Sequence, residues 1–257
     1  MADLAYNRIL LKLSGESLKG DLDYGIDPKA LAYLAGEIKE AFQMGVQLSA
    51  VVGGGNFWRG NEWEARGMDR GTADYMGMLA TLLNSLALQD SLEREGLDTR
   101  VMTAIDVRAV AEPYIRRRAI THLERNRLVL FASGTGNPYM TTDTAAALRS
   151  LEIDAEVLFM AKNRVDGVYD SDPHNNPGAK KFQHLDYIEA LNLRLEVMDA
   201  TALSLCMENQ LPIVVFDLFI PGSLSRLLRG DLLGTVVGQL QAPTTPQGDK
   251  KVPAVDI

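Results

Sequence analysis

Three clusters of small residues stand where short apolar runs of the sequence end. They are residues 12–15 (KLSG), residues 53–56 (GGGN) and residues 133–137 (SGTGN). Turns of this kind can bring backbone N–H groups close to phosphates, because no Cβ blocks the approach. Any one of them could be a simple turn, since strand ends often use glycine. Together, at three strand ends, they favour a phosphate-binding site.

Lys12 is the side chain in these clusters that is best suited to chemistry. It stands in an apolar strand terminus, where a cation is costly unless an anion lies beside it. A lysine there can neutralise charge on a phosphoryl group during transfer. Arg59, just past the triple glycine, could clamp a phosphate through two N–H groups. Asp143 could orient Lys12, or could only stabilise the start of a predicted helix.

The standard nucleotide and hydrolase motifs are absent. No glycine loop is followed by the Lys-Ser/Thr pair of a Walker loop. The stretch from Gly134 begins like a dinucleotide fingerprint, but Tyr139 stands where its third glycine would be. There is no nucleophile elbow. Three scattered histidines and a single cysteine, Cys206, predict no zinc site built by the protein.

Composition and charge narrow the classes of function. The 257 residues, 46% hydrophobic and 23% charged, suit an ordinary globular protein with room for one large α/β domain or two small lobes. The net charge of -8 argues against broad binding of nucleic acid or anionic membranes. A lone cysteine, no apolar run long enough for a membrane span and no signal peptide together predict a cytoplasmic protein.

Short apolar runs alternate with longer amphipathic ones, which predicts an α/β fold with a mostly parallel central sheet covered on both faces. The predicted strands span residues 9–13, 46–52, 100–105, 127–132, 155–160, 213–216 and 235–237. The predicted helices span residues 28–44, 72–95, 116–124, 142–151, 199–210 and 223–229.

Two further segments carry expectations of their own. In the helix over residues 72–95, Leu79, Leu82, Leu83 and Leu86 have the spacing of a buried stripe. The same leucine-rich helix could instead contribute to a contact between subunits. Residues 241–257 are polar and rich in proline, so we expect a flexible tail there.

The segments LLKLSGES, VVGGGNFWRG, MGMLATLLN, SGTGNPYMTTDTAA and KNRVDGVYDSDP resemble, in this order, the bacterial UMP kinases of the amino-acid-kinase family. The resemblance covers residues 8–238 and implies a three-layer, amino-acid-kinase-like domain over residues 1–240. The UMP-binding part would be about residues 1–150 and the ATP-binding part about residues 151–240. The implied reaction is transfer of the ATP γ-phosphoryl group to UMP, giving UDP and ADP, in pyrimidine nucleotide biosynthesis, with Mg²⁺ carried by ATP.

The same resemblance implies roles for individual residues. Lys12, Arg59 and Asp143 would be catalytic, and no protein side chain would ligate a metal. ATP contacts would come from Lys12, Leu13, Ser14, Gly15, Gly55, Arg59, Lys162, Asn163, Tyr169 and Asp172. UMP contacts would come from Gly54, Asp74, Thr135, Gly136, Asn137, Pro138, Tyr139, Met140, Thr141 and Thr142. Asp74 would take the ribose, because a carboxylate can accept hydrogen bonds from two adjacent hydroxyls. Lys162 would be a second cation on the ATP side. Because Arg164 stands close by, the alignment with the family leaves the position of this cation open by one residue.

A group of arginines makes one basic region in this acidic chain: Arg100, Arg108, Arg116, Arg117, Arg118, Arg125 and Arg127. It could be a solvated helix face paired with Glu112 and Glu124. Alternatively, the resemblance implies a homohexamer built as a trimer of dimers, an allosteric enzyme that GTP activates and UTP inhibits. Arg100, Arg116 and Arg127 would then contact the effector. Arg116 stands where some relatives carry an aromatic residue.

Two rival functions remain open at this point. One is a relative that phosphorylates a small acid such as acetylglutamate or carbamate. The other is a nucleotide sensor without catalysis. Lys12, Arg59 and Asp143 together argue against the sensor, because sensing needs no cation at a transferring phosphoryl group.

Overall fold

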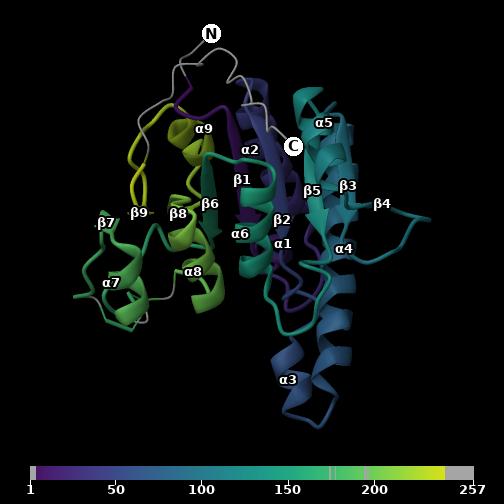
Figure 1. The fold of residues 1–257 in the computed structure, drawn as a ribbon, viewed down its shortest axis with the longest axis horizontal. Coiled ribbons are helices and arrows are strands. Elements are labelled where there is room, and N and C mark those ends of the chain that lie inside the picture. Colours follow the sequence, from purple (N-terminus) through teal and green to yellow (C-terminus); the bar gives the residue numbers. More distant parts are fainter. Residues whose placement is uncertain (1–3, 174, 177, 194, 196, 241–257) are drawn as a thin grey trace, which may run out of the picture.

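In the computed structural model, residues 4–173, 175–176, 178–193, 195 and 197–240 are described, so the predicted tail at residues 241–257 lies outside the described residues. Their strands form one nine-stranded sheet in the order β4-β3-β5-β2-β1-β6-β8-β9-β7 (Figure 1). The strands are β1 (Arg8–Leu13), β2 (Gln47–Val52), β3 (Thr99–Thr103), β4 (Glu112–Pro113), β5 (Leu128–Ala132), β6 (Val157–Lys162), β7 (His184–Leu185), β8 (Ile213–Asp217) and β9 (Thr235–Val237).

Neighbouring strands in this sheet run parallel, except for the antiparallel pair β8 and β9. The helices are α1 (Glu16–Lys19), α2 (Pro28–Gln43), α3 (Gly60–Glu64), α4 (Arg70–Arg94), α5 (Arg116–Glu124), α6 (Thr142–Glu152), α7 (Tyr187–Asn192), α8 (Ala200–Glu208) and α9 (Ser223–Leu228). The predicted mostly parallel α/β sheet is therefore confirmed. Among the described helices, none is both long enough and apolar enough to cross a membrane.

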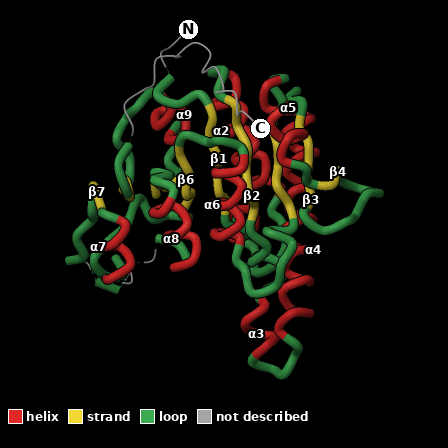
Figure 2. The backbone as a smooth tube through the Cα atoms, viewed as in Figure 1, coloured by secondary structure: helices red, strands yellow, loops and turns green. Residues whose placement is uncertain are grey.

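The alternation of side chains along each strand builds two cores, one on each face of the sheet. Leu11 of β1 belongs to the core that α2, α4 and α9 cover, whereas its neighbour Leu10 belongs to the core under α5, α6, α7 and α8. Figure 2 shows the strands running through the molecule between these helices. The result is a helix layer, a sheet and a second helix layer.

Most element ends follow residues that the sequence displays. Pro28 occupies the first turn of α2, and the Asp27 side chain accepts a hydrogen bond from the Lys29 N–H at 2.9 Å. Asp69 caps α4 in the same way through the Thr72 N–H at 2.8 Å, so this helix begins two residues before the predicted start. The short elements α1, α3, α7, β4 and β7 are not predicted by the sequence pattern, because each is too short to show a period.

The predicted buried stripe on α4 is only partly correct. Leu82 is 5% exposed, but Leu79 is 47% exposed and Leu83 is 54% exposed. The helical spacing of these leucines identifies one apolar side of the helix, yet it does not say whether another part of the protein covers that side. In Figure 1 the start of α4, together with α3, projects from the end of the sheet. The apolar positions of α4 therefore divide between the core and an outer face that stays open in one chain.

Candidate functional site

Lys12 lies between the two strands whose ends lead to the clefts described below. It is on β1, in register with Val51 of β2 on one side and Met160 of β6 on the other. Strand alternation puts Lys12 on the same face as Leu10, which is the face that α6 covers. The Lys12 side chain is 14% exposed, and its Nζ lies 2.6 Å from Asp143 Oδ1. The structure thus brings together two of the three charged residues singled out from the sequence.

The start of α6 holds Asp143 in place. Thr141 is the N-cap of this helix, and its Oγ1 accepts hydrogen bonds from the Asp143 and Thr144 N–H groups at 3.0 and 3.2 Å. The Thr141 hydroxyl donates in turn to Asp199, which also receives the Thr144 hydroxyl at 3.1 Å. Asp199 caps α8 through the Ala202 N–H at 2.9 Å. One carboxylate therefore ties the starts of two helices together beside Lys12.

The first cleft has a volume of about 370 Å³ and lies at the carboxyl ends of β2 and β5. Ligands of parallel sheets gather at such strand ends. Of the residues that the sequence analysis named, this cleft is lined by Gly54, Arg59, Asp74, Thr135, Met140, Thr141 and Thr142. Gly136, Asn137, Pro138 and Tyr139 belong to the same loop but are not among its lining residues.

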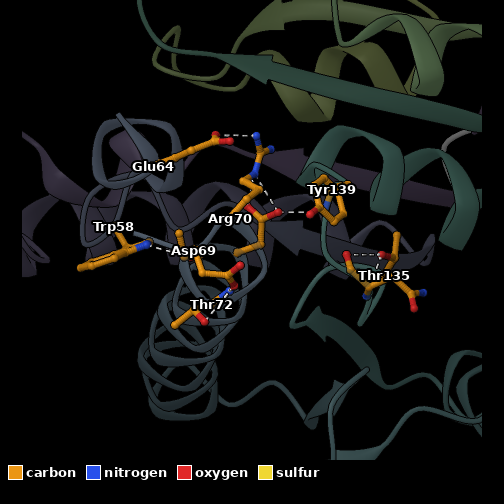
Figure 3. Close-up of polar contacts among 10 residues, drawn as sticks. Trp58, Glu64, Asp69, Arg70, Thr72, Thr135 and Tyr139 are labelled. Carbon is orange, nitrogen blue, oxygen red and sulfur yellow. Dashed lines mark hydrogen bonds and ion pairs between the residues drawn. The ribbon is translucent and has the colours of Figure 1, made fainter. Parts of the chain in front are cut away.

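Asp74 is fixed in this cleft by contacts from two segments. Arg70, one turn earlier on α4, donates from Nε to both Asp74 oxygens at 2.9 and 3.0 Å, and the Tyr139 N–H donates at 2.8 Å. Arg70 also binds Glu64 at 2.9 Å, and hydrogen bonding to Asp74 raises the pKa of Arg70. Figure 3 shows these contacts, with Arg70 between Glu64 and Tyr139. The sequence analysis missed Arg70, although its i,i+4 spacing from Asp74 was a readable signal.

The loop over residues 133–142 has an unusual backbone. Ser133 and Tyr139 have φ values of 62° and 68°, a region that residues other than glycine rarely adopt, and Gly134 and Gly136 also have positive φ. A residue held in this region costs about 1–3 kcal/mol and persists only where its surroundings fix it. For Tyr139 the fixing contact is the hydrogen bond from its N–H to Asp74. The loop is thereby shaped around the first cleft.

The second cleft has a volume of about 440 Å³ and adjoins the end of β6. Lys162, Tyr169 and Asp172 line it, whereas Asn163 is exposed next to it and is not a lining residue. The Tyr169 hydroxyl donates to Asp166 at 2.6 Å, and this hydrogen bond raises the pKa of Tyr169 to about 12. Because β1 lies between β2 and β6, Lys12 lies between the two strands that lead to the two clefts.

The first two glycine loops touch one another beside Lys12. The Gly53 N–H donates to Leu13 O at 2.9 Å, which joins the second loop to the end of β1. A Cβ on Gly15 would lie 2.8 Å from both Gly53 O and Gly55 N, so only glycine fits there. Ser14 follows Leu13, and its Oγ accepts from the Glu16 N–H at 3.3 Å. The predicted phosphate loops therefore form one continuous backbone surface.

Arg59 is held at the edge of this surface by a carboxylate that the sequence analysis did not name. Its Nη2 lies 2.5 Å from Glu16 Oε1, and the second oxygen of Glu16 lies 2.8 Å from Lys19 Nζ. Burial alone would raise the pKa of Glu16, but hydrogen bonds from Lys19 and Arg59 outweigh it and lower this pKa. Among the described residues, no three His, Cys, Asp or Glu side chains form a group that could hold a metal ion.

The basic region is paired differently from the expected helix face. Arg100 and Arg127 both bind Asp98, at 2.5 and 2.8 Å, and Arg116 binds Asp154 at 2.9 Å. Glu112 contacts His122 at 3.2 Å. A cavity of about 690 Å³ lies beside β3 and β4, and Arg100, Arg108 and Arg118 are among the residues that line it, whereas Arg116 and Arg127 do not.

Comparison with known proteins decides the family. The model of the amino acid kinase family matches residues 7–217. The chain belongs to the amino acid kinase family. The resemblance drawn from its motifs is confirmed, as is the fold class that this resemblance implied.

Solved structures of relatives support the assignment along most of the chain. The UMP kinase of Bacillus anthracis superposes with a TM-score of 0.88 at 40% identity, covering 91% of this chain and 96% of that one. The UMP kinase of Ureaplasma parvum gives 0.84 at 38% identity, with coverage of 90% and 98%. The uridylate kinase of Archaeoglobus fulgidus gives 0.70 at 25% identity, with coverage of 90% and 99%.

Proposed function

We propose that this member of the amino acid kinase family is a UMP kinase, which transfers the γ-phosphoryl group of ATP to UMP. The observation that carries the proposal is the position of Lys12, nearly buried, paired with Asp143, and between the strands that lead to two clefts. The likeness to two UMP kinases at 38–40% identity over nine-tenths of the chain supports UMP as the acceptor. UMP then occupies the cleft with Asp74, and ATP the cleft with Tyr169.

The reaction needs positioning and charge neutralisation more than proton transfer. An ionised oxygen of the UMP phosphate attacks the γ-phosphorus of ATP, and the bond from that phosphorus to the β–γ bridging oxygen breaks, leaving UDP and ADP. Lys12, aimed by Asp143, and Arg59, held by Glu16, neutralise charge on the transferring group. Mg²⁺ carried by ATP supplies further neutralisation of the phosphates, and it keeps largely nucleotide and water oxygens as ligands.

Each residue assigned to a nucleotide keeps that role within the proposal. Leu13, Ser14, Gly15 and Gly55 present backbone groups to the ATP phosphates, with Lys162, Asn163, Tyr169 and Asp172 on the nucleoside side. Gly54, Asp74 and residues 135–142 hold UMP. The product UDP places the enzyme in pyrimidine nucleotide biosynthesis, and a single cysteine, buried in the fold, suits the cytoplasm.

Assembly and regulation are further parts of the proposal. The outer face of α4 exposes Leu79 and Leu83, together with Tyr75 and Met76, which suits a contact with a second copy in a homohexamer built as a trimer of dimers. The cavity of about 690 Å³ carries Arg100, Arg108 and Arg118, which suits an anionic effector such as GTP as activator or UTP as inhibitor. Sedimentation of the chain, with activity measured against added GTP and UTP, tests both parts.

A coupled ADP-release assay with UMP, CMP and acetylglutamate side by side tests the reaction itself. We expect turnover with UMP, and faster turnover with acetylglutamate would overturn the assignment. The Lys12→Ala variant should lose about 10²–10³-fold in kcat, the usual cost of removing one preorganised donor. Lys39→Ala is the matched control, because Lys39 is an ion-paired lysine on α2, bound to Glu95 at 2.7 Å.

A further inference from the structure

A pair of buried asparagines lies beneath the glycine loop after β2. Asn56 ends the loop itself, and Asn84 is in the middle of α4, 28 positions later in the sequence. Both side chains are buried. The sequence analysis assigned neither side chain a nucleotide contact, and neither lines the clefts described above. A buried polar side chain is retained at little cost only when its hydrogen bonds are satisfied.

The two amides satisfy each other and two backbone carbonyls. Asn84 Nδ2 donates to Asn56 Oδ1 and to Gly53 O, both at 2.7 Å. Asn56 Nδ2 donates to Asn84 Oδ1 at 3.0 Å and to Gly25 O at 2.9 Å. Because the two outer partners are carbonyls, which only accept, each amide must direct its NH₂ group at one of them. All four N–H bonds of the pair are used, so its geometry is fixed.

The hydrogen bond from Asn84 to Gly53 O sets the direction of one N–H donor of the loop, that of Gly54. In a planar trans peptide the C=O and the following N–H point in opposite directions. Holding Gly53 O on Asn84 therefore turns the Gly54 N–H away from the amide pair. Among the described residues, neither the Gly54 nor the Gly55 N–H has a hydrogen-bond acceptor. Both are donors available to an anion, and the direction of the Gly54 N–H depends on Asn84.

The same pair also limits the position of the first phosphate loop. A Cβ on Gly15 would lie 2.6 Å from Asn56 Oδ1, so the backbone of that loop rests directly on the Asn56 side chain. On the other side, a Cβ on Gly54 would lie 3.0 Å from Ala80 Cβ and from Gly77 O, which are parts of α4. Both glycine loops thus rest on one buried support made by α4 and the amide pair.

We propose that Asn84 and Asn56 are positioning residues of the phosphoryl-transfer site, which fix the N–H group of Gly54 in the direction that binds phosphate. The inference deepens the proposed function and rests on it for its kinetic part. Removing Asn84 leaves Gly53 O without a partner and the Asn56 amide with its bond to Gly25 O alone in a buried site, and the loop then samples other peptide orientations. A misplacement of about 1 Å at such a site can cost about 10²-fold in rate.

The test compares Asn84→Ala with Ser85→Ala. Ser85 is the adjacent buried polar residue of α4, but its Oγ donates only to Thr81 O within the helix, at 2.8 Å. Hydrogen exchange of the unliganded protein should show the amides of Gly53, Phe57 and Trp58, which bind Leu13 O and Gly54 O, exchanging at least about tenfold faster in Asn84→Ala, with the amides of β2 unchanged. The kcat with UMP should fall about 10²-fold, and Ser85→Ala should match the wild type in both measurements.

Equal exchange at the Gly53, Phe57 and Trp58 amides and equal kcat in the two variants would overturn the inference, and would make the pair a packing feature only. If Asn84→Ala does not fold, Asn84→Asp takes its place, because it keeps the shape and the acceptor but loses the donor to Gly53 O. The same faster exchange of the Gly53, Phe57 and Trp58 amides is expected. Since exchange is measured without substrate, it tests the inference even if UMP proves to be the wrong acceptor.

Discussion

Asp143 offers the sharpest test of how Lys12 is held. The Lys12 Nζ lies 2.6 Å from Asp143 Oδ1, and unit charges at that distance interact by about 6 kcal/mol at an effective dielectric constant of about 20, before desolvation is subtracted. Replacing Asp143 with Asn keeps an acceptor of the same shape and removes only its charge. A hydrogen bond to a charged group contributes about 1–2 kcal/mol more net stabilisation than one between neutral groups. We therefore expect kcat to fall about 5–30-fold.

Asp143→Ala removes both the charge and the acceptor, and should lower kcat by about 10²–10³-fold, as for loss of a preorganised group. The KM values for ATP and UMP should change little in either variant, because Lys12 acts on the transferring group. The assay is steady-state kinetics of ADP release, with Asp154→Asn as the control, since Asp154 is 68% exposed and bound to Arg116. An Asp143→Ala enzyme that is folded and retains wild-type kcat would refute the reasoning.

Two further predictions concern the edges of the site. Asp74→Asn should raise KM for UMP by about 10-fold or more, the cost of charge-assisted hydrogen bonds to the ribose, and leave KM for ATP unchanged; equal increases would place Asp74 outside the UMP site. Lys19 and Arg59 lower the pKa of Glu16 from its ordinary value of 4.5, despite the burial of its carboxylate. The free energy that this ion pair adds to folding is therefore complete above the ordinary pKa, and it is lost as the pH falls through the lower pKa of the folded state. Thermal unfolding midpoints of wild type and Glu16→Gln should therefore differ at pH 7 and converge in strong acid, and a gap that persists in acid would contradict the ion-pair origin.

Sequence patterns predicted the elements that carry a clear period and clear end signals. The strand over residues 9–13 and the helix that starts at Pro28 are observed within a residue or two, because buried strands and capped helices leave local signatures. The side of β1 on which Lys12 lies follows from the same alternation. The ion pair with Asp143, by contrast, depends on how α6 packs over β1, and this is a tertiary fact that the sequence analysis could only offer as one of two alternatives.

What could not be predicted depends on contacts between distant segments. Asp199 looks like an ordinary helix N-cap in the sequence, and its hydrogen bond to Thr141, 58 positions earlier, exists only because α6 and α8 start side by side. The Asn56–Asn84 pair is hidden for the same reason. Leu83 illustrates the converse limit, since its spacing is that of a core residue although no part of the described chain covers it.

The two faces of α4 explain why one helix serves several parts of the site. On its inner side, Asn84 donates a hydrogen bond to Gly53 O. Thr81 Oγ1, on the same side, accepts a hydrogen bond of 2.8 Å from the N–H of Ser133, where the loop over residues 133–142 begins. Its outer side exposes Leu79 and Leu83. A helix is stiff along its axis, so a shift of α4 moves both loops together instead of one alone. A contact formed on the outer face therefore acts on the same helix that binds the Gly53 carbonyl and the Ser133 N–H, without any separate connection between the two.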